Sequence, residues 1–174
     1  MDRVVQQALA QVLSPEWEPR FSPASYAYRP GRGAHDALAA VVGWLEAGGV
    51  WVAHLDIEKF FDRVDHGRLV SKLEATGLDS RLVELIRHFL AAGAMAGGVW
   101  EDTPQGTPQG SPLSPLLANI VLDGLDHQLE ALGAKHVRYA DDLIILGQTR
   151  PEIEGMVEKI AAYLLAELNL RLNG

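Results

Sequence analysis

Apolar residues recur every three or four positions at the start of the chain, which predicts an amphipathic helix over residues 2–13 that stops at Ser14 and Pro15. Residues 14–33 are rich in proline and glycine and predict an irregular connection. Helical periodicity returns over residues 34–47 and ends at two glycines. Four aromatic side chains are expected to pin the connection: Trp17, Phe21, Tyr26 and Tyr28.

The middle of the chain changes from helical periodicity to a short apolar run and back. Residues 50–56 are mostly β-branched, aromatic or aliphatic and end in Asp56, which predicts a buried strand with an acid at its end. Two helices are predicted over 66–76 and 79–92, and residues 93–100 predict a short hairpin. The end of a strand is a favourable position for a chemically active side chain.

The last third of the chain predicts a helix, a hairpin and a further helix. The hairpin carries two acids, Asp141 and Asp142, at its tip. Strands and helices mix without regular βαβ order, which indicates the α+β class: a small, mostly antiparallel sheet with helices on one face. The predicted segments are a loop over 102–110, a helix that follows 112–115 and runs to 132, strands over 135–140 and 143–146, a helix over 152–169, and a strand that begins at 170–172.

Composition narrows the classes of protein. The 174 residues are 48% hydrophobic and 22% charged, as in a single folded domain. The absence of cysteine excludes disulfides and thiolate metal sites and agrees with a cytoplasmic location. The sequence has no apolar run near the roughly 20 residues that span a bilayer, and no export signal at its start, so no membrane role is expected. The formal net charge of −8 predicts weak binding to nucleic acid by this chain alone.

Three carboxylates stand out by position: Asp56 at a strand end, and Asp141 with Asp142 at a hairpin tip. Two acids in a turn, taken alone, are most often turn chemistry. If the two elements lie side by side, however, the like charges need cations between them. Mg²⁺ takes carboxylate and phosphate oxygens, and two ions roughly 3.5–4 Å apart can stabilise both the attacking and the leaving oxygen of phosphoryl transfer. The pattern therefore favours nucleotidyl transfer.

Three motifs resemble polymerase motifs of bacterial group II intron reverse transcriptases. They are Leu-Asp-Ile-Glu-Lys-Phe-Phe-Asp-Arg-Val-Asp-His at 55–66, Gly-Thr-Pro-Gln-Gly-Ser-Pro-Leu-Ser-Pro-Leu-Leu-Ala-Asn at 106–119, and Val-Arg-Tyr-Ala-Asp-Asp at 137–142. Upstream, residues 2–9 and 28–38 resemble that family's intervening segments, in the same order. The resemblance covers nearly the whole chain. It implies one reverse-transcriptase-like domain, with about 1–49 as partial fingers and connection and about 50–174 as the palm.

The resemblance also implies a metal site. Asp56 corresponds to the first metal-binding aspartate, and the carbonyl of Ile57 is expected to join it. Asp141 corresponds to the second metal ligand, with Asp142 in support. The implied cofactor is a pair of Mg²⁺ ions, for which Mn²⁺ can substitute.

Further residues resemble the nucleotide site of the family. Phe61 corresponds to the steric gate beneath the incoming sugar, with core packing as its alternative role. Gln109 and Gly110 match the loop that approaches the incoming nucleotide and the template. The earlier copy of this motif, with Gln105 and Gly106, is expected to be loop filler.

Two arginines flank a rigid turn. Arg29 and Arg32 lie on either side of Pro30 and Gly31, and guanidinium groups suit fixed contacts to template or nucleotide phosphates. A solvated position, or an ion pair with Asp36, is the alternative for these arginines. The six histidines lack ligand spacing and are expected to be structural or on the surface.

The implied reaction is attack by the 3′-hydroxyl of a DNA primer on the α-phosphorus of a deoxynucleoside triphosphate, directed by an RNA template. Relatives carry a first fingers segment before the matching region, and a thumb and a maturase region after it, that this sequence does not contain. Such segments in trans and a group II intron RNA are therefore further implied partners. The alternative is a non-catalytic RNA-binding or maturase-like assembly module derived from a reverse transcriptase. An RNA-directed RNA polymerase palm shares the acids but fits the flanking motifs poorly. Metal binding that disappears in Asp141→Asn favours the enzyme.

Overall fold

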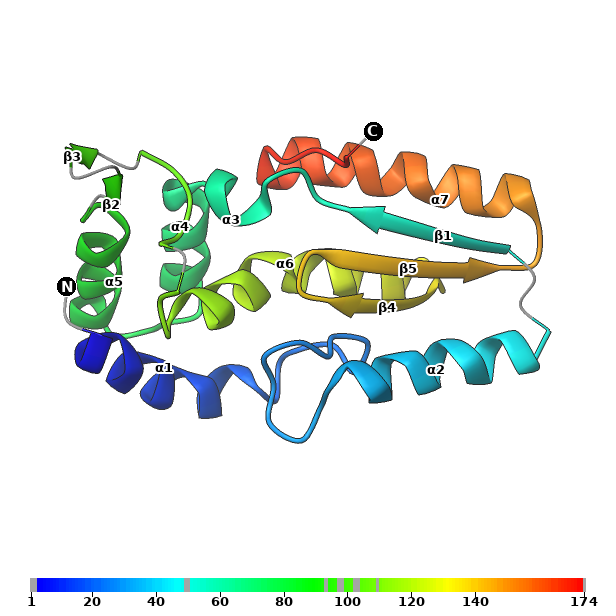
Figure 1. Ribbon diagram of the computed structural model, residues 1–174, viewed down its shortest axis with the longest axis horizontal. Helices are drawn as coiled ribbons and strands as arrows, with labels where there is room; N and C mark the ends of the chain where they lie inside the picture. Colours follow the sequence, from blue (N-terminus) through cyan, green and yellow to red (C-terminus); the bar gives the residue numbers. More distant parts are fainter. Residues whose placement is uncertain are drawn as a thin grey trace.

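The chain forms a small antiparallel sheet between helices, as Figure 1 shows. The computed structural model describes residues 3–48, 51–92, 94–96, 99–101, 104–108 and 110–173. The strands are β1 (Trp51–Asp56), β2 (Ala94–Ala96), β3 (Val99–Glu101), β4 (Lys135–Tyr139) and β5 (Asp142–Gly147). The helices are α1 (Arg3–Trp17), α2 (Ala34–Glu46), α3 (Phe60–Arg63), α4 (His66–Ala75), α5 (Ser80–Leu90), α6 (Ser114–Ala131), α7 (Arg150–Tyr163) and η1 (Leu164–Leu168), a π-helical turn that continues α7.

The main sheet has the order β1-β5-β4, and β5 is antiparallel to both neighbours. Asp142 is the register partner of Asp56 on β1 and of Tyr139 on β4. Directly opposed residues of an antiparallel sheet point to the same face. The acid-bearing ends of β1 and β5 therefore meet at one end of one face.

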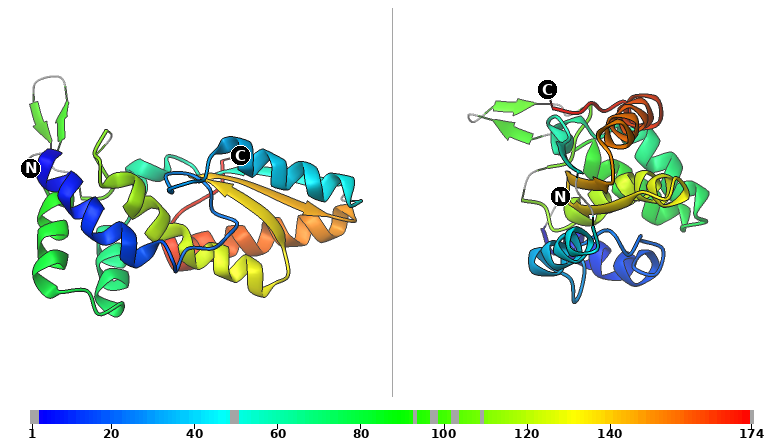
Figure 2. Two further views of the ribbon diagram at one scale, coloured as in Figure 1. Left: turned by 90° about the horizontal axis from the view of Figure 1, so that it is seen from below. Right: turned by 90° about the vertical axis from the view of Figure 1, so that its right-hand side faces the viewer.

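The opposite face of the sheet packs against α6 and α7. Leu143 and Ile145 of β5 point into the main core with Leu55 of β1. Ile120 and Leu122 of α6, both fully buried, belong to the same core. Figure 2 shows α6 and α7 together on this side of the strands. Their burial fixes the sheet and hence the position of the acids.

A helix also covers part of the acid-bearing face. Ala37 and Val41 of α2 pack on Val137 of β4 and Leu146 of β5 in a second, smaller core. The prediction that helices cover only one face is therefore wrong at this edge. Alternation places apolar side chains of β4 and β5 on both faces, and each set needs cover from water.

Most predicted elements are confirmed within two residues or so, and two helix ends differ. α1 runs through Pro15 to Trp17, because a proline in the last turn removes only one hydrogen bond and Glu18 still donates from its N–H to the Ser14 carbonyl at 2.9 Å. α7 gives way to η1 at Leu164, and the predicted final strand is reduced to a bridge between Leu172 and Ile57. Among the described helices, none is both long and apolar enough to cross a membrane.

Candidate active site

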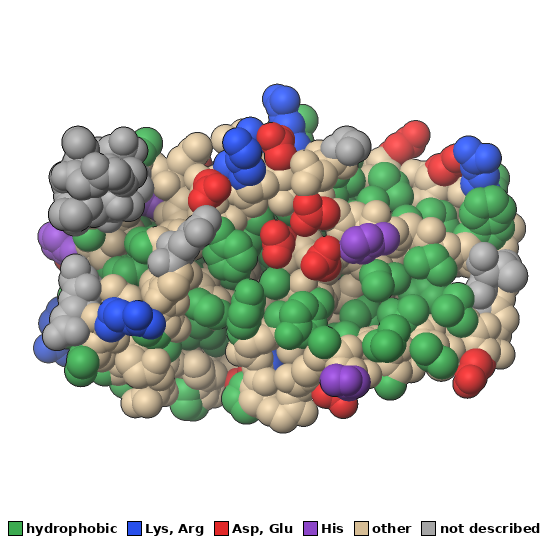
Figure 3. Space-filling view, viewed as in Figure 1, with side chains coloured by type: hydrophobic (Ala, Val, Ile, Leu, Met, Phe, Trp, Pro, Cys, Tyr) green, Lys and Arg blue, Asp and Glu red, His purple; other side chains and the backbone are tan. Residues whose placement is uncertain are grey.

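Three carboxylates converge where β1 and β5 meet. Asp56 and Asp142 are register partners, and Asp141 occupies the turn between β4 and β5. Burial raises the pKa of the Asp141 carboxyl above its usual range, and the charges of Asp56 and Asp142 raise this pKa further. Figure 3 shows acidic side chains gathered near the middle of this face, beside a histidine. The structure thus brings together the three acids that the sequence singled out.

Two of these acids already have polar neighbours. His54 Nε2 lies 3.0 Å from Asp142 Oδ1, so this histidine belongs to the site rather than to a remote surface. Asn173 donates from its side chain to Asp56 Oδ2 at 2.5 Å and from its backbone to the Asp56 carbonyl at 2.8 Å. Neither partner was predicted from the sequence, because both lie far along the chain from the acid that they contact.

The acidic cluster offers only oxygen donors from its carboxylates, which suits a hard divalent cation. In the part of the chain that the structure describes, no group of three or more His, Asp or Glu side chains is arranged to hold an ion as it stands. The acids would therefore have to turn toward one another. Ile57, the fourth predicted ligand, has a buried side chain and bridges Leu172, and the role of its carbonyl remains a prediction.

Phe61 lies between the core and a small cavity. Phe60, its neighbour in α3, is buried, and the two rings meet edge to face with centroids 5.2 Å apart. Phe61 is half-buried and lines a cavity of about 230 Å³ together with Tyr28 and Gly110. A larger groove of about 670 Å³ between α4, α6 and η1 contains none of the predicted site residues. Two small hollows therefore adjoin the predicted site residues: the small cavity beside Phe61, and one of about 220 Å³ that is lined by Asp142 and His54.

The first Thr-Pro-Gln-Gly copy is not loop filler. Gly106 donates from its N–H to the Val64 carbonyl at 2.7 Å, and Thr107 donates to the Phe61 carbonyl at 2.7 Å. The carbonyl of Gly106 also lies 2.6 Å from His66 Nε2. These contacts fasten the loop to the short helix that carries Phe61, which corrects the sequence prediction.

Replacing Gly106 by alanine is expected to lower the free energy of unfolding by about 2–3 kcal/mol. Gly106 has a φ of +88°, and an added Cβ would lie 2.8 Å from the Asp62 carbonyl oxygen and 2.9 Å from that of Phe61, both backbone atoms. Urea denaturation measures the loss. Gly133→Ala is the control, because Gly133 also has a positive φ but has no other atom within 4 Å of the added Cβ. Equal losses in the two variants would contradict a role for the close contact.

The second copy is described only in part. Gln109 lies outside the described residues. Gly110 is exposed, has a φ of +76° and lines the small cavity, and an added Cβ there would meet nothing within 4 Å. Its role near a nucleotide remains a prediction.

Arg29 points into the protein, so the prediction that it contacts phosphates is corrected. Its side chain is 4% exposed and pairs with Glu18, with Nε donating to Glu18 Oε1 at 2.9 Å. Nη1 donates to the carbonyls of Ser22 at 2.5 Å and Ser25 at 2.8 Å. The ion pair expected with Asp36 is absent, since that acid instead accepts from the N–H of the residue capping α2. The Arg29 guanidinium therefore links backbone carbonyls of this loop to Glu18 inside the protein.

Arg32 keeps part of its surface exposed. Its Nη1 donates to the Pro23 carbonyl at 2.6 Å, and its guanidinium lies 5.4 Å from the centre of the Tyr26 ring. Contact between Arg32 and phosphates remains a prediction.

Arg138 of β4 is a buried arginine for which the sequence predicted no role. Its guanidinium pairs with Asp126 of α6, with Nη2 donating to Oδ2 at 2.6 Å, and both residues are buried from solvent. Nη1 donates to Asn119 Oδ1 and to the Ala140 carbonyl, each at 3.0 Å, and Nη2 donates to Ser25 Oγ at 2.9 Å. This network holds the turn that carries the acids against α6. An arginine within a buried, alternating strand was the only sequence signal for it.

Several known proteins are similar to this chain in sequence or in structure. The model of the family described as reverse transcriptase (RNA-dependent DNA polymerase) matches residues 1–174. Protein YkfC of Escherichia coli (strain K12) is 30% identical over 99% of this chain and 55% of its own length. The group II intron-encoded protein LtrA of Lactococcus lactis subsp. cremoris is 37% identical over 82% of this chain and 24% of its own length. A structure of telomerase from Candida tropicalis has a TM-score of 0.71 at 13% identity, with 95% of this chain and 32% of that chain covered. The chain thus spans about half or less of the proteins that it matches.

Proposed function

The chain belongs to the reverse transcriptase (RNA-dependent DNA polymerase) family, and from that premise we propose that it acts as the polymerase palm of a group II intron-type protein. The reaction is attack by a primer 3′-hydroxyl on the α-phosphorus of a deoxynucleoside triphosphate, with loss of pyrophosphate. The observation that carries the proposal is the pairing of Asp56 with Asp142, with Asp141 in the adjoining turn. The family's description as an RNA-dependent DNA polymerase supports RNA as the template.

The carboxylates have a common task in this proposal. Asp56 and Asp141 hold divalent cations, with the Ile57 carbonyl as a further ligand and Asp142 in support. When bound, the ions lower the pKa of the attacking hydroxyl and balance the charge of the triphosphate. Burial and then repulsion from Asp56 and Asp142 raise the pKa of Asp141, and a bound cation would relieve the repulsion. Until the ions bind, His54 holds Asp142 and Asn173 holds Asp56.

The small cavity receives the sugar of the incoming nucleotide in this proposal. Phe61 lines the cavity and blocks a 2′-hydroxyl. Gly110 lets the backbone approach the nucleotide closely, and Gln109 and Arg32 are further candidates for contact with the nucleotide or template.

Replacing Phe61 by alanine is expected to raise the use of ribonucleotides relative to deoxynucleotides by about 10–100-fold, because space opens where the 2′-hydroxyl would lie. The ratio of kcat/KM for the two nucleotides measures the change. Phe61→Tyr keeps the ring and is the control. An unchanged ratio in the alanine variant would favour core packing as the only role of Phe61.

The direct test of the function is extension of a DNA primer on an RNA template with deoxynucleotides and Mg²⁺. Extension that stops when the metal is chelated supports the proposal. Because the chain spans about half or less of the length of these relatives, the assay is repeated with fingers and thumb segments of a relative added in trans. A chain that binds RNA but extends no primer under either condition contradicts the proposal and favours a non-catalytic assembly module.

A further inference from the structure

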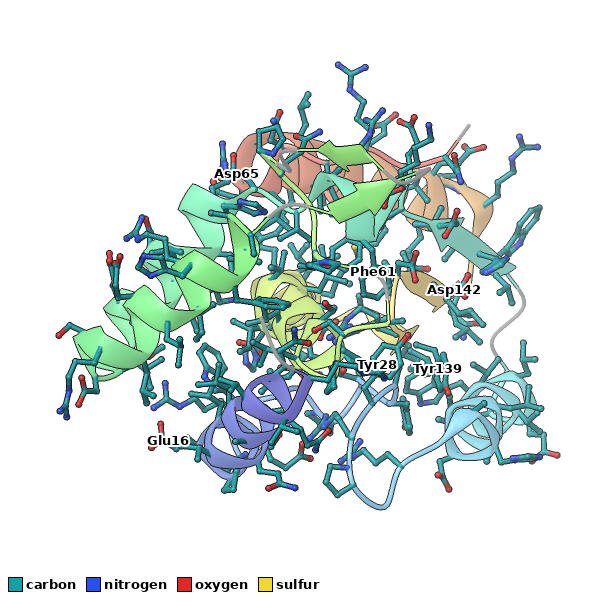
Figure 4. All side chains as sticks on the ribbon, turned by 60° about the vertical axis from the view of Figure 1, so that its left-hand side comes forward. Glu16, Tyr28, Phe61, Asp65, Tyr139 and Asp142 are labelled. Carbon is teal, nitrogen blue, oxygen red and sulfur yellow. The ribbon has the colours of Figure 1, made fainter. Side chains whose placement is uncertain are left out.

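Tyr28, in the loop before α2, is exposed, whereas the other aromatic residues there are buried or half-buried. Tyr28 is 54% exposed. It lines the small cavity opposite Phe61, together with Gly110. Figure 4 shows Tyr28 next to Tyr139 at the end of β4, below Phe61 and Asp142. Burial and then the charge of Asp141 raise the pKa of the Tyr28 hydroxyl, in keeping with a position close to the acids.

The backbone of Tyr28 has a conformation that a tyrosine rarely adopts. Its φ is 60°, in the left-handed region that favours glycine. The preceding residue, Ala27, is fully buried, and its carbonyl accepts a hydrogen bond from Asn119 Nδ2 at 2.9 Å. The unfavourable conformation is thus imposed from the interior of the protein, while the ring itself points to the cavity. Such strain is found preferentially where a side chain has to be presented to a ligand.

One buried amide links this loop to the turn that carries the acids. While Nδ2 of Asn119 holds the Ala27 carbonyl, Oδ1 of the same side chain accepts from Arg138 Nη1 at 3.0 Å. Arg138 in turn donates to the carbonyl of Ala140, next to the acids. The tyrosine and the acids are therefore fixed relative to one another through a rigid core.

We propose that Tyr28 is a nucleotide-binding residue that forms the wall of the site opposite Phe61 and packs its ring on the nucleoside of the incoming deoxynucleotide. This inference rests on the proposed function, which supplies the ligand. The cavity, at about 230 Å³, is smaller than the roughly 300–1,000 Å³ of a drug-sized ligand site and accommodates one nucleoside unit rather than several. An aromatic ring that is exposed on one side stacks on any base and needs no hydrogen bond to do so.

Tyr28→Gly tests the proposal, because it is expected to weaken nucleotide binding without lowering the stability of the fold. Calorimetric titration of the 174-residue chain with dATP and Mg²⁺ should give a Kd about tenfold higher in the variant, since base–aromatic packing is lost. The urea midpoint should stay the same or rise, because glycine adopts a positive φ without strain. If the role of Tyr28 were merely structural, Tyr28→Gly would leave the Kd for dATP unchanged and lower the urea midpoint. Tyr28→Phe should bind like the parent, because the ring remains.

Two controls isolate the ring contact. Asn169→Gly relieves the same kind of backbone strain, at a φ of 55° after η1 and outside the cavity lining, and should leave the dATP Kd unchanged. Tripolyphosphate with Mg²⁺ lacks the nucleoside, so its Kd should not respond to Tyr28→Gly. Equal dATP binding by the parent and Tyr28→Gly would overturn the role of Tyr28 alone, and so would an equal loss for tripolyphosphate. A parent chain that binds no dATP would overturn this inference together with the proposed function.

Discussion

Replacing Asp141 by asparagine is expected to lower primer extension on an RNA template by about a thousandfold or more while the chain remains folded. The amide keeps the shape of the side chain but loses the negative charge needed to hold a divalent cation. The structure predicts the effect on stability as well. Burial and two neighbouring acids raise the pKa of Asp141 in the folded chain, so its ionised form destabilises the fold as the pH rises through the carboxyl range. Without divalent ions at neutral pH, the variant should be at least as stable as the parent.

Extension rates and urea denaturation of the same preparations separate the two effects. Asp62→Asn is the matched control, because Asp62 is an exposed acid of α3 close along the chain to Asp56 and is not a predicted ligand. This control should retain most of the activity. An Asp141→Asn variant that extends primers within tenfold of the parent would contradict the assignment of Asp141 as a metal ligand.

Asp126→Asn is expected to lower the free energy of unfolding by about 3–5 kcal/mol, because it leaves the Arg138 guanidinium buried without its counter-charge. Both side chains are almost completely inaccessible to water, and the shortest N–O distance between them is 2.6 Å. Urea denaturation at neutral pH measures the loss. The large effect comes from the orphaned charge rather than from the strength of the pair.

A surface ion pair of similar length provides the control for this second prediction. Arg150 and Glu154 lie 2.7 Å apart on α7, but both side chains are more than half exposed. Glu154→Gln should therefore cost less than about 0.5 kcal/mol. The double variant Asp126→Leu with Arg138→Met should regain part of the lost stability, because neither charge remains. Similar costs for Asp126→Asn and Glu154→Gln would refute the argument from burial.

Helices and strands with a clear period could be predicted from the sequence, and shorter elements could not. The limits of α2 and β1 were predicted to within one residue, because apolar spacing and flanking glycines mark them. α3 has only four residues, too few for a helical period to be visible. Its position depends instead on the contacts of Gly106 with the backbone near Phe61, which join segments far apart in the sequence.

The acids of the site were predictable because the ends of strands and tips of hairpins can be located in a sequence. The direction of a long side chain could not be predicted in the same way. Arg29 and Arg138 both lie in motifs of the family, and only tertiary packing reveals that each guanidinium points inward. Tyr28 is the opposite case, since an aromatic residue expected to bury itself is held at the surface by the backbone.

The pairing of β1 with β5 also determines when the acidic site can arise during synthesis. His54 and Asp142 touch across the sheet although they are 88 positions apart in the chain. Within the described sheet, β5 is the only strand next to β1. Because β5 comes much later in the chain, β1 leaves the ribosome long before its partner exists. A slip of one residue when the two strands finally meet would turn the acids to opposite faces. A nascent chain therefore acquires its acidic face in one late step, when the strand that carries Asp142 closes the sheet in register.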